Sequence, residues 1–332
     1  MNSLRSSQLS AMLFLSAAFT ILCQTTSWTM EGIFGTGIAV AVQFLLCVPI
    51  FLLYRQGFSL SDGDVKHRLL STLLLGYLLV RGGVSFVRLQ RASDALTLPV
   101  SGKFFAAALI ALVCIYTASL GIRALARSST LILGLLLFAL AVLLLGAVPQ
   151  AEPQNLSLST DDTIFRGFLR EMACADELPL LLLLFDQMAH RRVRSTLQFL
   201  AGKLGLFAFL ALLGMAVLGD RMAHSPLPFF STISVSQPFS TQRADALYLV
   251  IFVMLCVLRI TLFTVFAARC LARLLPRLQY ASTICLGGML AISAAAAHFS
   301  ISAVWQIAAM VLFTSLISLG LLLRQKFGGK TP

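Results

Sequence analysis

Residues 129–148 read STLILGLLLFALAVLLLGAV, an uncharged and almost wholly apolar run that is long enough to cross a lipid bilayer as a helix. Similar runs recur along the chain. Of its 332 residues, 58% are hydrophobic and only 11% are charged, whereas a soluble domain carries roughly 25% charged residues. A soluble protein of this size could not bury so much apolar surface. The sequence therefore predicts an integral membrane protein and excludes a soluble enzyme, a disordered chain and a nucleic-acid-binding domain.

The spacing of the apolar runs predicts about ten transmembrane helices in a single polytopic transmembrane domain, residues 1–332. The runs are continuous, whereas the strands of a membrane barrel alternate apolar and polar residues. Helices also satisfy their own backbone polar groups in lipid. The first run is expected to be an uncleaved span. The predicted spans are residues 8–28, 33–54, 68–89, 103–121, 129–148, 167–187, 195–218, 244–275, 280–299 and 302–323.

The net charge of +12 comes from basic residues that stand singly or in short groups between the spans. With the N-terminus in the cytoplasm, about twice as many Lys and Arg residues fall on the cytoplasmic side as on the other. This asymmetry predicts that both termini are cytoplasmic. It also indicates attraction to anionic lipid headgroups rather than to nucleic acid. The seven cysteines lie in or beside apolar runs without metal-ligand spacing, so they predict packing residues and no metal or other cofactor.

Ionisable residues inside the predicted spans are the strongest functional signal, because a charge near the bilayer centre costs about 2.5–3.5 kcal/mol on insertion scales. The candidates are Arg81, Asp176, Glu177, Lys203 and Arg259. Lys203 lies near one end of its span and is expected to extend to the cytoplasmic surface. Arg81 precedes Gly82-Gly83, a pair more typical of close helix packing than of ligand contact, but it remains a candidate site residue.

The sixth span carries two of these acids in the stretch FLREMACADELPL, residues 168–180. Pro179 removes a helical hydrogen bond at the carbonyl of Ala175 and predicts a free acceptor beside Asp176 and Glu177. Broken helices at the bilayer midplane hold the polar ends of substrates in many transporters. The stretch therefore predicts a ligand site that includes Ala175, Asp176 and Glu177. The alternative is a proline kink whose acids pair with arginines inside the helix bundle.

Arg259 lies among apolar residues of the eighth span and must face either a partner or a watery cavity. It is expected to pair with Glu177 or to hold a substrate carboxylate, and both alternatives stay open.

Sequence motifs for nucleophilic, zinc-dependent or nucleotide-dependent catalysis are absent, and the four histidines are dispersed. The sequence therefore predicts neither an enzyme nor ATP-driven transport by this chain alone.

Four segments resemble the B-subunit family of the GerA-type spore germination nutrient receptors, which belongs to the amino acid/polyamine/organocation transporter superfamily. Each motif is short, and their order and spacing carry the resemblance over most of the chain. The segments are Ser6–Leu9, Leu96–Pro99 with Gly121–Arg127, Asp176–Leu178, and Arg243–Leu247 with Leu258–Ile260.

The resemblance implies two inverted five-helix repeats of the amino acid permease type, with a ligand site between unwound parts of spans 1 and 6. The matching positions are Thr20, Glu177 and Arg259. Thr20 is flanked by Phe19 and Ile21 where the family has glycines, which makes unwinding of span 1 less favourable.

The function implied by the resemblance is that of a membrane sensor. The chain is expected to bind a small nutrient, such as an amino acid, and to signal to a membrane subunit and a lipoprotein subunit of a germination receptor. Its expected location is the cell membrane or the spore inner membrane. The alternatives are a proton-coupled amino acid permease and a structural subunit whose site has lost its ligand.

Overall fold

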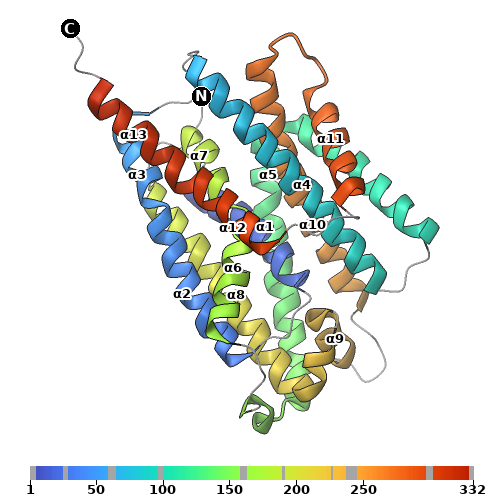
Figure 1. Cartoon of the computed structure of the whole chain (residues 1–332). Coiled ribbons are helices and arrows are strands. Elements are labelled where there is room, and N and C mark those ends of the chain that lie inside the picture. The colour runs from blue at the N-terminus through green and yellow to red at the C-terminus, as the bar shows by residue number, and fades with distance from the viewer. Residues whose placement is uncertain are drawn as a thin grey trace.

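The computed structural model describes residues 5–24, 29–58, 65–95, 100–157, 163–188, 191–225, 227–236, 245–296 and 302–328. These residues form helices, turns and loops and contain no strand (Figure 1). The motif residues Leu96–Pro99 and Arg243 lie outside the described residues.

The helices follow the predicted apolar runs. The longer ones are α1 (Ser6–Leu22), α2 (Met30–Leu46), α3 (Val48–Arg55), α4 (Val65–Ala95), α5 (Val100–Ala147), α6 (Ile164–Ala173), α8 (Arg192–Leu218), α9 (Pro228–Val235), α10 (Asp245–Leu274), α11 (Ala281–Ala296), α12 (Ala303–Val311) and α13 (Ile317–Gly328). The short ones are η1 (Val148–Gln150), η2 (Pro153–Ser157), η3 (Leu178–Leu180), α7 (Leu181–Leu184), η4 (Phe185–Gln187), η5 (Gly219–His224) and the π-helix η6 (Leu312–Leu316).

Six of the described helical segments are long and apolar enough to cross a bilayer. They are Met30–Arg55, Arg68–Asp94, Ala106–Gln150, Arg192–Leu218, Ala246–Leu274 and Ala303–Arg324. Two shorter apolar helices are Ser6–Leu22 and Ala281–Ala296. Together with the composition, they make this chain an integral membrane protein.

Element α5 contains two predicted spans, residues 103–121 and 129–148, and turns between them at Gly121. The backbone there has φ 80° and ψ 176°, a conformation that only glycine adopts without strain. The exposed side chains of Arg123 and Arg127 follow this turn. The sharp bend thus separates two helical halves and places basic residues at the connection.

Helices α2 and α6 pack with their backbones in direct contact, because glycines face each other across the interface. A Cβ atom on Gly35 would collide with the carbonyl oxygen of Ile164 and would lie 2.8 Å from the amide nitrogen of Phe168. A Cβ atom on Gly167 would lie 2.8 Å from the Cα atom of Gly32. Small residues at such positions are what permit close helix approach in membranes.

We expect Gly35→Ala to lower the free energy of unfolding by about 2 kcal/mol or more, because the new methyl group has no space. The matched control is Gly37→Ala on the same helix, where nothing lies within 4 Å of the added Cβ atom. That control is expected to be neutral or stabilising, since alanine favours helix formation over glycine. Thermal unfolding of the two purified variants checks the difference, and equal midpoints would contradict the packing described.

The bundle contains two groups of helices that pack closely within themselves. In the first group, α2 packs against α6 and α8, whereas in the second group α4 packs against α10 and α11. Helix α1 lies between the groups and contacts α8, α5 and α10. The charged residues described below lie where α4 and α10 of the second group face α1 and the end of α6.

Candidate functional site

The sixth predicted span is broken, as its sequence predicted. Helix α6 runs from Ile164 to Ala173 and is capped by Thr163, whose hydroxyl accepts the amide of Arg166 at 3.3 Å. Residues 174–177 are not helical, and the short helices η3, α7 and η4 follow. The break places Asp176 and Glu177, both fully buried, in the gap between two helical pieces.

The acceptor predicted at Ala175 is not free. Its carbonyl accepts the amide of Leu178 through a long hydrogen bond of 3.4 Å, because the chain turns tightly after the break. The carbonyl of the next residue, Asp176, is also engaged, since it accepts the Tyr77 hydroxyl at 3.2 Å. Ala175 therefore helps to shape the turn, and the Asp176 carbonyl binds Tyr77.

Span 1 does not unwind at Thr20. Helix α1 continues through Leu22, and Thr20 is buried within its last turns between the apolar residues Phe19 and Ile21. Without a glycine or proline in this segment, the helical hydrogen bonds are kept. Thr20 still reaches the site, because its hydroxyl accepts Nη1 of Arg88 at 3.2 Å.

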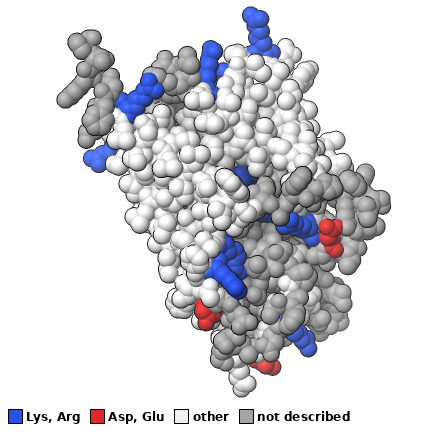
Figure 2. Space-filling model, viewed as in Figure 1, with Lys and Arg blue, Asp and Glu red and all other residues white. Residues whose placement is uncertain are grey.

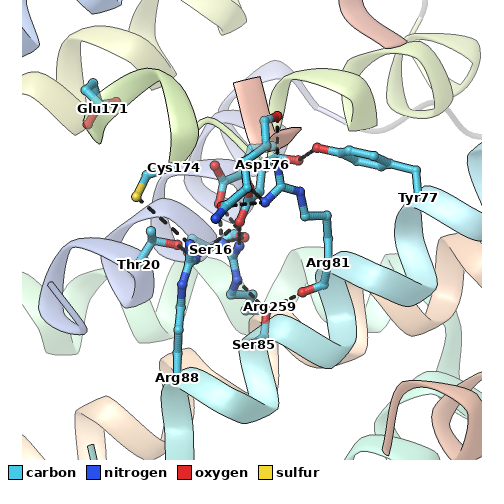
Figure 3. Close-up of polar contacts among 12 residues, drawn as sticks. Ser16, Thr20, Tyr77, Arg81, Ser85, Arg88, Glu171, Cys174, Asp176 and Arg259 are labelled. Atoms are coloured by element: carbon cyan, nitrogen blue, oxygen red, sulfur yellow. Dashed lines mark hydrogen bonds and ion pairs between the residues drawn. The ribbon is translucent and has the colours of Figure 1, made fainter. Parts of the chain in front are cut away.

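Arg259 of α10 lies at the centre of the site and contacts both acids (Figure 3). Its Nη2 lies 2.6 Å from Oδ2 of Asp176, and its Nη1 contacts Oε1 of Glu177. Nη1 also donates to the carbonyl of Ser16 at 2.9 Å, and Nε donates to the Ser85 hydroxyl at 2.9 Å. The pairing of Arg259 with Glu177 that the sequence offered as one alternative is therefore present.

Arg81 of α4 contacts the other oxygen of Asp176. Its Nη1 lies 3.0 Å from Oδ1 and donates to the side-chain oxygen of Gln306 at 2.9 Å. The following glycines have a packing role, as expected, because a Cβ atom on Gly82 would collide with Met289 of α11. Arg81 therefore belongs to the site, and its neighbouring glycines bring α4 close to α11.

Arg88 is the site residue that the sequence interpretation missed. It lies near the end of the predicted third span, residues 68–89, and is not among the candidates drawn from the sequence. In the structure its Nη1 lies 3.2 Å from Oδ2 of Asp176, and its Nη2 faces the Cys174 sulfur at 3.9 Å. A signal was available, because Arg81, Ser85 and Arg88 follow the spacing of one helix face.

The charges of this site come from opposite sides of an interface. The three arginines belong to α4 and α10, and their side chains are 4%, 15% and 0% exposed for Arg81, Arg88 and Arg259. The two carboxylates belong to the break after α6. The ion pairs therefore join the two helix groups. Within the described residues, Oε2 of Glu177 is buried and has no hydrogen-bond partner.

Lys203 does not extend to the membrane surface, and that prediction was wrong. Its side chain is buried and forms an ion pair with Glu171 of α6, which also accepts the amide of Gln43 at 3.2 Å. The buried ammonium group is compensated by the Glu171 carboxylate beside it, because an unpaired charge in this position would be strongly unfavourable. Because α2, α6 and α8 all belong to the first helix group, this pair is internal to the group. Among the described residues, no cluster of three or more His, Cys, Asp or Glu side chains is suited to hold a metal ion.

Comparison with known proteins assigns the chain to a family. A family model described as spore germination protein matches residues 68–303, more than half of the chain. The chain belongs to the spore germination protein family. The match confirms the resemblance noted from the sequence, and the matched region of this spore germination protein contains both carboxylates and all three arginines.

No curated protein matches this spore germination protein. Among solved structures, one titled "Inward facing conformation of Mhp1" is similar, with 15% sequence identity and a TM-score of 0.52. The similarity covers 96% of this chain and 77% of that one. At such low identity it shows a shared overall fold and nothing about the ligand.

Proposed function

We propose that this chain senses a small nutrient, such as an amino acid, at the break in span 6 and signals to partner subunits of a germination receptor. One observation carries the proposal: a buried network of ion pairs joins two helix groups at a broken helix. Ionised side chains inside a membrane are energetically costly. Where membrane proteins contain them, they commonly line the sites that recognise a ligand or an ion. We propose no catalytic activity.

Signalling requires that the nutrient bind one arrangement of the helix groups more tightly than another. In the proposed mechanism, the ligand ammonium binds Oε2 of Glu177, which has no hydrogen-bond partner among the described residues, and the ligand carboxylate binds the arginines of α4 and α10. Both contacts compete with the ion pairs that now join the groups. Binding therefore changes how the groups are held together, and partner subunits, expected to be a membrane subunit and a lipoprotein, respond to that change.

The proposed topology has ten spans in two inverted five-helix repeats within one transmembrane domain. The described chain supports this count if α5 is divided at Gly121, the two shorter apolar helices are included and the broken sixth segment counts as one span. We place the domain in the cell membrane or the spore inner membrane.

The proposed orientation has both termini in the cytoplasm. The first turn of α1 lies at the same end as the start of α8, since the Ser195 hydroxyl donates to the carbonyl of Ser6, and α13 ends there as well (Figure 1). Figure 2 shows basic side chains at this upper end, and both basic and acidic ones in the lower part of the same face. A basic end agrees with the cytoplasmic side of a membrane protein.

The test of the sensor is the Glu177→Gln variant in spores. It removes one charge but keeps the shape, so we expect the response to amino acids to fall by at least tenfold while the protein level and its association with partner subunits stay unchanged. The matched control is Glu152→Gln, which removes an exposed charge in the loop between α5 and α6. A full nutrient response from Glu177→Gln would reject the proposal.

A second candidate function is a proton-coupled amino acid permease. The observation that favours it is the buried carboxylate of Glu177, one oxygen of which has no partner in the part of the chain that the structure describes. Such a group can take up and release a proton as its surroundings change. Uptake of radiolabelled amino acids into proteoliposomes separates the two functions. Accumulation driven by a proton gradient supports the permease, whereas binding without uptake supports the sensor.

A further inference from the structure

We infer that the ligand of this site carries a net negative charge, as an acidic amino acid or a small dicarboxylate does. Arg88 is the residue that selects for this charge. The inference rests on the proposed function, because it names the class of ligand that binds at the same break in span 6.

The charges of the site do not balance. Arg81, Arg88 and Arg259 supply three positive charges, whereas Asp176 and Glu177 supply two negative ones. The nearby ammonium group of Lys203 is already neutralised by Glu171. One positive charge therefore remains among side chains that are almost completely removed from water, which is unfavourable unless an anion joins them.

The carboxylate of Asp176 is shared among all three arginines. Oδ1 contacts Arg81, and Oδ2 contacts both Arg88 at 3.2 Å and Arg259 at 2.6 Å. Glu177 contacts only Arg259 among the three. Arg81 and Arg259 have further oxygen acceptors, since Arg81 donates to Gln306 and Arg259 donates to Ser16 and Ser85.

Arg88 is the least satisfied of the three arginines. Its Nη1 is divided between Asp176 and Thr20, both at 3.2 Å, and within the described part of the chain its Nη2 has only the Cys174 sulfur at 3.9 Å. Sulfur is a weak acceptor. Arg88 is also the most exposed arginine of the cluster, and Cys174 beside it is partly exposed. The site is therefore least closed beside Nη2 of Arg88, which faces sulfur and not oxygen.

A ligand carboxylate fits this position. It accepts from Nη2 of Arg88, and it also accepts the hydroxyl hydrogen of Thr20, because the Thr20 oxygen is itself an acceptor for Nη1. A neutral amino acid brings one negative and one positive charge and leaves the excess unchanged. An acidic amino acid or a dicarboxylate brings the additional negative charge that balances the site.

The experiment measures binding of acid and amide pairs to the purified full-length chain in nanodiscs at constant ionic strength. The ligands are glutamate with glutamine, aspartate with asparagine, and succinate with succinamide, since each pair differs in charge but little in shape. We expect at least one acid to bind tenfold or more tightly than its amide. In Arg88→Gln this ratio is expected to fall close to one. Arg91→Gln, which removes an exposed charge one turn further along α4, is expected to keep the ratio.

The outcomes separate the inference from the proposed function. Amides that bind as tightly as their acids would overturn the inference and leave the nutrient sensor intact. An acid preference that persists in Arg88→Gln would overturn the role of Arg88. Binding of none of these compounds, nor of alanine, would reject the proposed function together with the inference. If Arg88→Gln does not fold, Arg88→Lys is used instead, because it keeps the charge but loses the planar fork and is expected to reduce the ratio.

Discussion

Asp176→Asn is expected to be the most destabilising single substitution in the site, lowering the free energy of unfolding by about 3–5 kcal/mol. Asp176 contacts all three arginines, and for Arg81 and Arg88 it is the only ion-pair partner within the described residues. Asparagine keeps the shape but removes the charge, so three buried guanidinium groups are left with Glu177 alone. Unfolding in a denaturing detergent, followed by circular dichroism, measures the effect.

The control for this substitution is Glu152→Gln, which also removes one negative charge but at an exposed position in the loop after α5. It is expected to change the free energy of unfolding by less than about 0.5 kcal/mol. A loss in Asp176→Asn no larger than in this control would show that the network contributes little to stability and is not held as described.

The second large effect is the dependence of Arg259 on Glu177. Arg259→Met leaves Glu177 buried without a cation and is expected to cost about 3–5 kcal/mol. In the double variant Arg259→Met/Glu177→Gln, the unpaired carboxylate is removed as well, so part of that loss is expected to be recovered. A double-mutant cycle on the free energy of unfolding is expected to give a coupling of about 2 kcal/mol or more.

The cycle has a natural comparison within the same protein. Lys203→Met with Glu171→Gln removes another buried ion pair, but one that lies inside the first helix group. We expect coupling in that cycle too, without any change in the acid-to-amide ratio of ligand binding. Strict additivity of Arg259→Met and Glu177→Gln would contradict the contact between these residues.

The membrane class and the broken sixth span could be predicted from sequence because both depend on local patterns. Continuous apolar runs define spans, and two acids followed by Pro179 interrupt one of them. The pairing of Glu177 with Arg259 was one of two stated alternatives, because an ion pair lowers the cost of placing both charges inside a bilayer. The geometry of this ion pair, in which Arg259 also donates to Ser16 and Ser85, depends on how the helices pack. Local sequence patterns do not predict that packing.

The remaining differences have similar physical reasons. Arg88 lies near the end of its predicted span, where hydropathy indicates a position close to water. In the structure the helix continues to Ala95, and the Arg88 side chain contacts Asp176. Lys203 was expected at the surface because its partner Glu171 lies on a different helix. The unwinding implied at Thr20 came from the family resemblance, and the apolar neighbours of Thr20 keep that part of α1 helical. Ligand binding by these residues stays a prediction.

The central claim is that a nutrient binds where span 6 is broken, and Cys174 reports on that position directly. It is the one partly exposed cysteine, whereas the other six are buried, and it lies beside Arg88. We therefore measure alkylation of the purified chain by a small water-soluble thiol reagent, with Cys174→Ser as the control that identifies the labelled residue. A saturating mixture of the common amino acids is expected to slow labelling of Cys174 at least fivefold. An unchanged rate in the presence of that mixture would contradict a ligand site at the break.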